Sequence, residues 1–475
     1  MTRYARGWLA VSLATLLSLL LIGGAGAHGS HSSPIQTFTQ MVGPYEIGLT
    51  IEIPPAAPAP INIDIVVPQD MGEATLTMRT ALRGQPVDQA LPVEVKTLAG
   101  DTQPIYYAQV TIDRLGDWEI ELQAAGAQGS GVALIPFTVA QTPLPAYSVP
   151  LLVALGSLVA LMITMIAVAS VYNSRRKAIP AWLSWLLGRG VFAALIVAIV
   201  FGALQLNDST QAARASAQGA TYLPAGTLVT GSGRPHVNMV LRANPAAAQV
   251  DQPVTLTLHL TDGGTGLPVD DLVTHHEALL HLAVISGDGA FFLHTHPARR
   301  GPGLFQIDIT PTVPGRYTAF AEIERLDSGT QVLRGQFDVA GQSVAAVPAA
   351  GFGTRTIGNI QVTVDASKAV VAGQQTTLIF SFRDTNGAPI RDLNPWLGMA
   401  GHVMAHSNDS AIFAHIHAAE RTPPYGRPAV TNGTVYGPDI RFVYTFPQPG
   451  RYQVWGQFKH AGRVLTVPLT IEVAA

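Results

Sequence analysis

Two long segments in the second half of this chain repeat one another, and the repeat restricts the folds that the chain can adopt. The stretch QPVTLTLHLTDGGTGLPVDDL (252–272) matches QQTTLIFSFRDTNGAPIRDL (374–393). HLAVISGDGAFFLHTHP (281–297) matches HVMAHSNDSAIFAHIHA (402–418), and PGRYTAFAEI (314–323) matches PGRYQVWGQF (449–458). The repeated unit of about 120 residues is the size of one Ig-like domain. A duplicated unit of this size predicts two consecutive domains of the same fold.

The pattern within the repeats and in the N-terminal part of the chain is typical of β-strands. Short runs alternate apolar and polar residues, as in YEIGLTIEI (45–53) and INIDIVV (61–67), and turns rich in proline and glycine separate them. Such runs favour an all-β sandwich. The segment LGDWEIEL (115–122) resembles the PGRY strand and hints at a more distant third copy. We therefore expect three Ig-like sandwiches, at residues 28–147, 234–342 (repeat 1) and 357–475 (repeat 2).

Apolar segments predict that the chain is a multi-pass membrane protein. Residues 1–27 have the basic start, apolar run and Ala-Gly-Ala site of a signal peptide. Runs at about 149–172 and 190–206 are long enough to cross a bilayer and form a transmembrane helical hairpin at 148–206. The loop between them carries only cationic charges, which predicts a cytoplasmic loop. Both β-rich regions would then be extracytoplasmic, with a linker at 207–233.

Histidines recur at the same places in both repeats. A two-residue turn at Gly287-Asp288 would pair His281 with His294 and place His296 on the same face of the hairpin. A turn at Asn408-Asp409 would likewise pair His402 with His415 and place His417 beside them. We expect each group of three imidazoles to lie on an exposed strand face. The repeated spacing predicts one three-histidine metal site in each repeat.

The ligand types suggest copper, with zinc as the alternative. The chain has no cysteine, so thiolate ligands and disulfides are excluded. Neutral imidazoles suit both ions, and a thioether favours copper. Weaker candidate ligands are His275, His276, His406, Met404 and His28, the last because cleavage after Ala27 would leave it as the first residue. The other interpretation is a solvated strand face or a pH-sensing histidine cluster that binds no metal.

Composition and motifs exclude several classes of function. The net charge is −3 and there are no basic blocks, so nucleic acid is not an expected partner. The chain lacks a G-x-S-x-G elbow, a P-loop, a dinucleotide-binding fingerprint and an H-E-x-x-H motif. An open three-histidine site could serve a copper oxidase or zinc hydrolase, but no general base is evident, so we do not expect an enzyme. The alternative to a metal-binding protein is a structural or protein-interaction Ig-like surface protein.

The histidine motifs resemble those of a known group. HEALLHLAVISGDGAFFLHTHP (276–297) and PWLGMAGHVMAHSNDSAIFAHIHA (395–418) resemble bacterial exported Ig-like domains with a histidine-rich hairpin, similar to the YtkA-like and FixH-like copper-associated proteins. The resemblance covers residues 234–475. It implies that the three histidines of each hairpin bind metal, and that the chain works as a copper chaperone, buffer or sensor. It also implies copper-handling or cytochrome oxidase assembly proteins as partners.

Overall fold

The computed structural model describes most of the two β-rich parts of the chain. The described residues are 35–54, 57–68, 71–98, 105–139, 236–325, 329–342, 350–397, 399–408, 412–419 and 435–475, with short pieces between 170 and 181 and at 221–222. The predicted signal peptide, His28, nearly all of the membrane hairpin and most of the linker lie outside them. Among the described residues, no helix is both long enough and apolar enough to cross a membrane. The membrane topology therefore stays a prediction.

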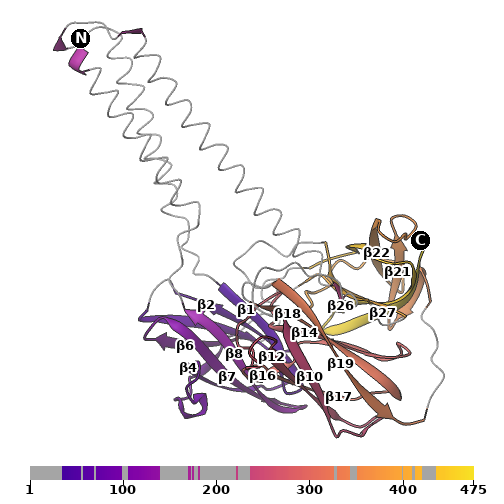
Figure 1. The fold of residues 1–475 in the computed structure, drawn as a ribbon, viewed down its shortest axis with the longest axis horizontal. Helices are drawn as coiled ribbons and strands as arrows, with labels where there is room; N and C mark the ends of the chain where they lie inside the picture. Colours follow the sequence, from indigo (N-terminus) through magenta and orange to yellow (C-terminus); the bar gives the residue numbers. More distant parts are fainter. Residues whose placement is uncertain are drawn as a thin grey trace. The chain divides into compact units, whose positions relative to one another are not determined.

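The N-terminal β region, residues 35–139, consists of two antiparallel sheets (Figure 1). The first has the order β1-β2-β3-β6-β5, with strands β1 (Ile35–Val42), β2 (Tyr45–Glu52), β3 (Ala59–Val66), β6 (Ile105–Ile112) and β5 (Val95–Leu98). The second has the order β4-β7-β8, with strands β4 (Thr75–Leu82), β7 (Gly116–Gly126) and β8 (Gly129–Val139). Alternate residues of β3 are apolar and buried, namely Ile61, Ile63 and Ile65. This alternation is what the sequence pattern requires of a strand with one face on a core.

Repeat 1 also consists of two sheets. One has the order β10-β12-β17-β16, with strands β10 (Val237–Asn244), β12 (Val254–Asp262), β17 (Leu304–Ile309) and β16 (Ala298–Gly301). The other has the order β11-β19-β18-β14-β15, with strands β11 (Ala248–Gln249), β19 (Gly329–Ala340), β18 (Gly315–Arg325), β14 (Leu280–Ser286) and β15 (Phe292–Thr295). The short β13 (Leu272–Val273) pairs with β18. All these pairs are antiparallel except β11 with β19.

In repeat 2 the central strands follow the same order as in repeat 1, as a duplication predicts, while the edge strand β9 comes from residues 221–222 of the predicted linker. One sheet has the order β20-β21-β22-β25, with strands β20 (Gly353–Ile357), β21 (Ile360–Ala366), β22 (Gln375–Asp384) and β25 (Asp439–Thr445). The other has the order β27-β26-β23-β24-β9, with strands β27 (Arg463–Val473), β26 (Gly450–His460), β23 (His402–Ser407), β24 (Phe413–His417) and β9 (Thr221–Tyr222). The described chain is thus mostly β, in several antiparallel sheets consistent with Ig-like sandwiches.

The same type of side-chain hydrogen bond recurs in all three β regions, and it explains why the PGRY pattern is repeated. Tyr317 and Tyr452 each donate a hydroxyl hydrogen bond to the backbone carbonyl four residues upstream, at 2.7 and 3.1 Å. Trp118 donates its indole N–H to the carbonyl four residues upstream at 3.2 Å. This is the tyrosine-corner arrangement of Ig-like sandwiches. The segment LGDWEIEL therefore makes the same kind of contact as the two PGRY strands.

The two repeats pack face to face through the sheets that carry the histidines. Every residue of β14, β23 and β24 is buried, so these strands are covered on both faces. One face lies on the core of its own repeat. The other forms an apolar cluster between the repeats, which consists of Ala283, Ile285, Phe320, Met404, Phe413 and Trp455. Figure 1 shows β14 and β18 of repeat 1 close to β26 of repeat 2.

Aromatic side chains hold the repeats together within this apolar cluster. Phe320 stacks on Phe413 with ring centroids 4.3 Å apart, and Phe292 stacks on Trp455 at 4.7 Å. Stacked aromatic pairs contribute about 0.5–1.5 kcal/mol each beyond the burial of their surface. The predicted exposed histidine faces are therefore wrong, because each repeat covers the histidine face of the other.

Candidate metal centre between the two repeats

The hairpins that carry the histidines have a different register from the predicted one. Ser286 donates its backbone N–H to the carbonyl of Phe291 at 3.1 Å, which leaves a four-residue loop between them. The hydroxyl of Ser286 accepts the N–H of Phe291 at 2.8 Å and stabilises this wider loop. Ser407 and Ile412 make the equivalent contacts in repeat 2. The prediction of a two-residue turn was wrong. The serine hydroxyl accepts the backbone N–H of Phe291 or Ile412, and it competes for this group with the pairing that a tight turn requires.

The new register changes the cross-strand pairs but keeps the predicted face. His294 pairs with Ala283 instead of His281, and His402 pairs with His417 instead of His415. Both pairings differ from the predicted ones by two residues. Because side chains alternate with a period of two, a shift of two residues leaves each side chain on the same face. The histidines of each hairpin therefore still point in one direction.

The six principal histidines form one buried cluster instead of two exposed sites. Their exposed fractions are 3% or less, for His281, His294, His296, His402, His415 and His417. Rings from the two repeats lie next to each other: the centroid of His294 is 4.9 Å from that of His415 and 5.1 Å from that of His402. The side chains therefore converge at the interface between the repeats.

The weaker candidates fall into two groups. His275 and His276 join the cluster, and the ring of His276 lies 3.8 Å from that of His417. His406 packs against Phe320 with ring centroids 5.4 Å apart, and Met404 belongs to the apolar cluster. The thioether of Met404 thus has an apolar environment in the described structure, and the preference for copper loses part of its support.

Backbone carbonyls determine which nitrogen of two rings carries the proton. His281 Nε2 lies 2.9 Å from the carbonyl oxygen of His275, and His296 Nδ1 lies 2.8 Å from that of Thr39. A carbonyl oxygen only accepts hydrogen bonds, so both of these nitrogens must be donors. In a neutral imidazole the other nitrogen then has a lone pair. His281 Nδ1 and His296 Nε2 are these other nitrogens, and they face each other at 3.0 Å.

Two lone pairs at this distance repel unless a cation lies beside both. Burial lowers the pKa of His281 to about 3, and burial together with the neighbouring histidines lowers the pKa of His296 well below its ordinary value. A bridging proton is therefore unfavourable at neutral pH. Two nitrogens bound to one tetrahedral zinc ion at about 2.0–2.1 Å lie about 3.3 Å apart, close to the spacing observed. The pair is arranged as two ligands of one metal ion would be.

The equivalent pair in repeat 2 is satisfied in a different way. His402 Nε2 donates to the carbonyl of Trp396 at 2.9 Å, so His402 Nδ1 has the lone pair. That lone pair faces His415 Nε2 at 2.9 Å, and His415 Nδ1 lies 2.7 Å from Glu322 Oε2. Burial raises the pKa of Glu322 to about 8 and lowers that of His415 well below its ordinary value. The 2.7 Å contact would also fit an ion pair, but burial keeps both groups neutral, so the Glu322 carboxyl donates to His415, which donates to His402.

His294 is common to both possible sets of metal ligands. Its Nδ1 lies 3.2 Å from the amide oxygen of Gln457, and its Nε2 is buried with no hydrogen-bond partner among the described residues. Two groups of three histidines each have ligand atoms within 4.8 Å of one another, and they are His281–His294–His296 and His294–His402–His415. Both nitrogens of His417 are also buried and unpartnered within the described part of the chain. Buried polar atoms without partners are rare, and an ion is one ordinary reason for them.

Sequence reasoning missed Glu322 and Gln457, which orient histidines across the interface. They occupy the same position in the two PGRY strands, at residue nine of PGRYTAFAEI and PGRYQVWGQF. Glu322 contacts His415 of repeat 2, and Gln457 contacts His294 of repeat 1. The available signal was a polar residue at the same position of the two repeated strands. The contact between each residue and the other repeat could not be read from the sequence.

The N-terminal β region closes one side of the cluster. The backbone N–H of Met41 in β1 donates to the carbonyl of His296 at 2.8 Å, and that of Thr39 donates to the carbonyl of Glu277. The Thr39 carbonyl in turn accepts from the His296 ring. These contacts fix the orientation of His296, so three parts of the chain contribute to the site.

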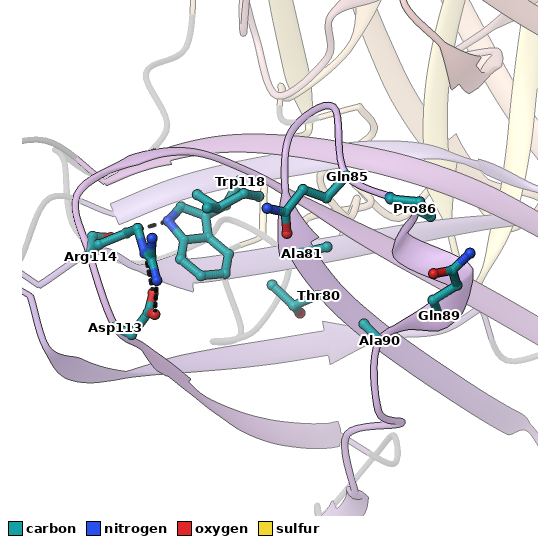
Figure 2. Close-up of a pocket in the computed structure, with 10 residues that line it drawn as sticks. Thr80, Ala81, Gln85, Pro86, Gln89, Ala90, Asp113, Arg114 and Trp118 are labelled. Atoms are coloured by element: carbon teal, nitrogen blue, oxygen red, sulfur yellow. Dashed lines mark hydrogen bonds and ion pairs between the residues drawn. The ribbon is translucent and has the colours of Figure 1, made fainter.

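A separate pocket in the N-terminal β region has weaker chemical features. It measures about 570 Å³ and is lined by residues that include Gln85, Gln89 and Trp118 (Figure 2). Its charged residues, Asp113 and Arg114, pair with each other at 2.6 and 3.0 Å. Because these charges already satisfy one another, the histidine cluster is the stronger candidate site.

A comparison with known protein families finds the same domain in both repeats, but it does not show what the protein does. The model of a domain of unknown function, DUF8832, matches residues 236–341 and again 355–475. These matches follow the two repeats and together cover just under half of the chain. A search of the curated proteins found no match. The closer assignment to the YtkA-like and FixH-like group stays a prediction.

Several solved structures are similar only at a low level. The Escherichia coli adhesin FdeC is 10% identical over 92% of this chain and 100% of its own, with a TM-score of 0.15. A membrane-anchored protein from Corynebacterium diphtheriae is 9% identical over 90% and 92% of the two chains, with a TM-score of 0.15. The Yersinia pseudotuberculosis adhesin InvE is 14% identical over 50% and 59%, with a TM-score of 0.16. Scores of this size support no conclusion about function, which has to come from the site.

Proposed function

We propose that the histidine cluster binds a transition-metal ion, copper or alternatively zinc, and that the protein is an extracytoplasmic metal-binding protein. The observation that carries the proposal is the pair His281 Nδ1 and His296 Nε2, whose lone pairs face each other at 3.0 Å. Both rings are turned this way by carbonyl acceptors on their far sides. A metal ion beside the two nitrogens removes the repulsion between them.

The donor set favours copper or zinc over harder cations. The ligands are neutral imidazoles, whereas magnesium and calcium prefer oxygen ligands. Each histidine of the two three-histidine groups has an outer hydrogen bond that fixes its ring, as is usual for metal-binding histidines. Copper is retained as the first choice because the histidine motifs resemble those of copper-associated proteins.

The burial of the histidines helps to distinguish a sensor or buffer from a chaperone. The six principal histidines are 3% exposed or less, so an ion can reach or leave them only when the repeats or the N-terminal β region move aside. That property suits a sensor or a tight buffer better than a chaperone that exchanges its ion rapidly. An extracytoplasmic location and copper-handling or cytochrome oxidase assembly partners are part of the same proposal, and they rest on the sequence predictions.

The direct test is the metal content of the full-length chain. The protein is purified without a polyhistidine tag, exposed to Cu²⁺ or Zn²⁺, passed through a desalting column and analysed by mass spectrometry for bound metal. We expect stoichiometric metal in the natural chain, and its loss in a variant that combines His281→Ala, His294→Ala and His296→Ala, because this variant removes ligands from both three-histidine groups. His259→Ala is the matched control, because His259 lies in β12 of the opposite sheet of repeat 1. A natural chain that keeps neither ion contradicts the proposal.

A further inference from the structure

We infer that the cluster holds one metal ion at a time in two alternative positions that share His294, one within repeat 1 and one that links the two repeats. This inference rests on the proposed function and adds the stoichiometry and the consequence of binding. It follows from the identity of the shared nitrogen and from the part of the chain that supplies each ligand.

The two positions exclude each other because they need the same lone pair. His294 belongs to both three-histidine groups. Its Nδ1 faces the amide oxygen of Gln457, and the amide nitrogen of Gln457 donates to Thr466 Oγ1 at 3.3 Å, which keeps the oxygen turned toward the ring. Only Nε2 of His294 is then free to bind metal, and one lone pair binds one ion.

An ion in the first position would be bound by repeat 1 alone, whereas an ion in the second position would link the two repeats. His281, His294 and His296 all lie in repeat 1, so an ion held by them makes no bond to repeat 2. His402 and His415 lie in repeat 2, so an ion held by them and by His294 cross-links the repeats. The first position has two lone pairs already aimed at one point, and we assign it as the position of entry.

Movement between the positions is a ligand exchange. The bonds from the metal to His281 and His296 break, bonds to His402 and His415 form, and the bond to His294 is kept. The ion does not change its oxidation state. The proton that His415 Nε2 donates to His402 Nδ1 leaves to solvent, and the proton of the Glu322 carboxyl passes to His415 Nδ1, so that His415 stays a neutral imidazole and Glu322 becomes a carboxylate. The result is that binding of metal fastens repeat 2 to repeat 1.

The test combines a Cu²⁺ titration followed by native mass spectrometry with hydrogen exchange of the backbone amides. The full-length natural chain should bind one ion and gain protection in both hairpins, at β14–β15 and β23–β24. His402→Ala should still bind one ion but gain protection only in β14–β15. His296→Ala should bind one ion and keep the gain in both hairpins. His259→Ala should behave as the natural chain does.

His294→Ala tests the shared ligand. It removes one ligand from both positions, so affinity should fall by more than the roughly 10–100-fold that follows loss of an outer-shell partner. Two ions bound at once to the natural chain would overturn this inference and leave the proposed function standing. Protection of β23–β24 by metal in the His402→Ala variant would overturn it too. No bound ion at all would overturn the proposed function and this inference with it.

Discussion

Acidification should separate the repeats, because the interface contains eight histidines that burial keeps neutral. Burial is the largest cause of the lowered pKa in each of them. The pKa falls to about 3 for His281 and about 4 for His275 and His402. It falls well below the ordinary value for the other five, which are His276, His294, His296, His415 and His417.

The sign of the effect follows from where protons bind. In the unfolded or opened chain each histidine takes up a proton near pH 6.5, whereas in the folded interface it stays neutral. The stability that these groups contribute is therefore complete above pH 6.5 and is lost progressively as the pH falls toward their folded pKa values. Glu322 acts in the opposite direction, since its pKa is raised to about 8, but it is one group against eight.

The magnitude is large compared with the stability of a domain. At pH 5.5, one unit below the unfolded pKa, keeping one histidine neutral costs about 1.4 kcal/mol. Eight such groups cost about 11 kcal/mol, and whole domains are stable by only about 5–15 kcal/mol. We expect the metal-free interface to open between pH 6.5 and 5.5.

Tryptophan fluorescence can follow this opening. Trp455 stacks on Phe292 at the interface and should report its separation. The measurement is the urea midpoint of the metal-free chain, kept free of metal with a chelator, at pH 7.5, 6.5 and 5.5. His259→Ala should follow the same profile as the natural chain. Saturating Cu²⁺ should shift the loss of stability to lower pH, because an ion that binds only the folded state stabilises it. A midpoint that stays constant from pH 7.5 to 5.5 would refute the argument.

Three further predictions address the orienting carboxyl, the apolar contact and the topology. Glu322→Ala removes the hydrogen-bond partner of His415, so Cu²⁺ should protect β23–β24 less from hydrogen exchange while the protection of β14–β15 is kept, and unchanged protection of β23–β24 would contradict that role. Phe320→Ala, at a fully buried position of the interface, should lower the free energy of unfolding by about 3–5 kcal/mol. Val240→Ala, at a position that is 51% exposed, should change it by less than about 0.5 kcal/mol. Reporter fusions in the loop 173–189 should read cytoplasmic and those at Ala125 and Ala475 external; the reverse pattern would contradict the predicted topology.

The sequence by itself determined the local features of the protein. The repeats predicted two domains of one fold, and the apolar–polar alternation predicted sheets. The spacing of His281, His294 and His296 placed them on one strand face even though the predicted turn was too short. That inference survived because the side-chain direction in a strand depends only on whether a position is odd or even.

Only the tertiary structure decided what covers that face. The strand HLAVIS is buried on both sides, and the second side is covered by repeat 2, more than 100 residues away in the chain. The same packing brings Glu322 to His415 and Gln457 to His294, and β1 brings Thr39 to His296. Packing between domains depends on the fit of whole surfaces, which residue spacing within one hairpin does not contain. For this reason the sequence indicated two exposed three-histidine sites, and the fold made them one buried cluster.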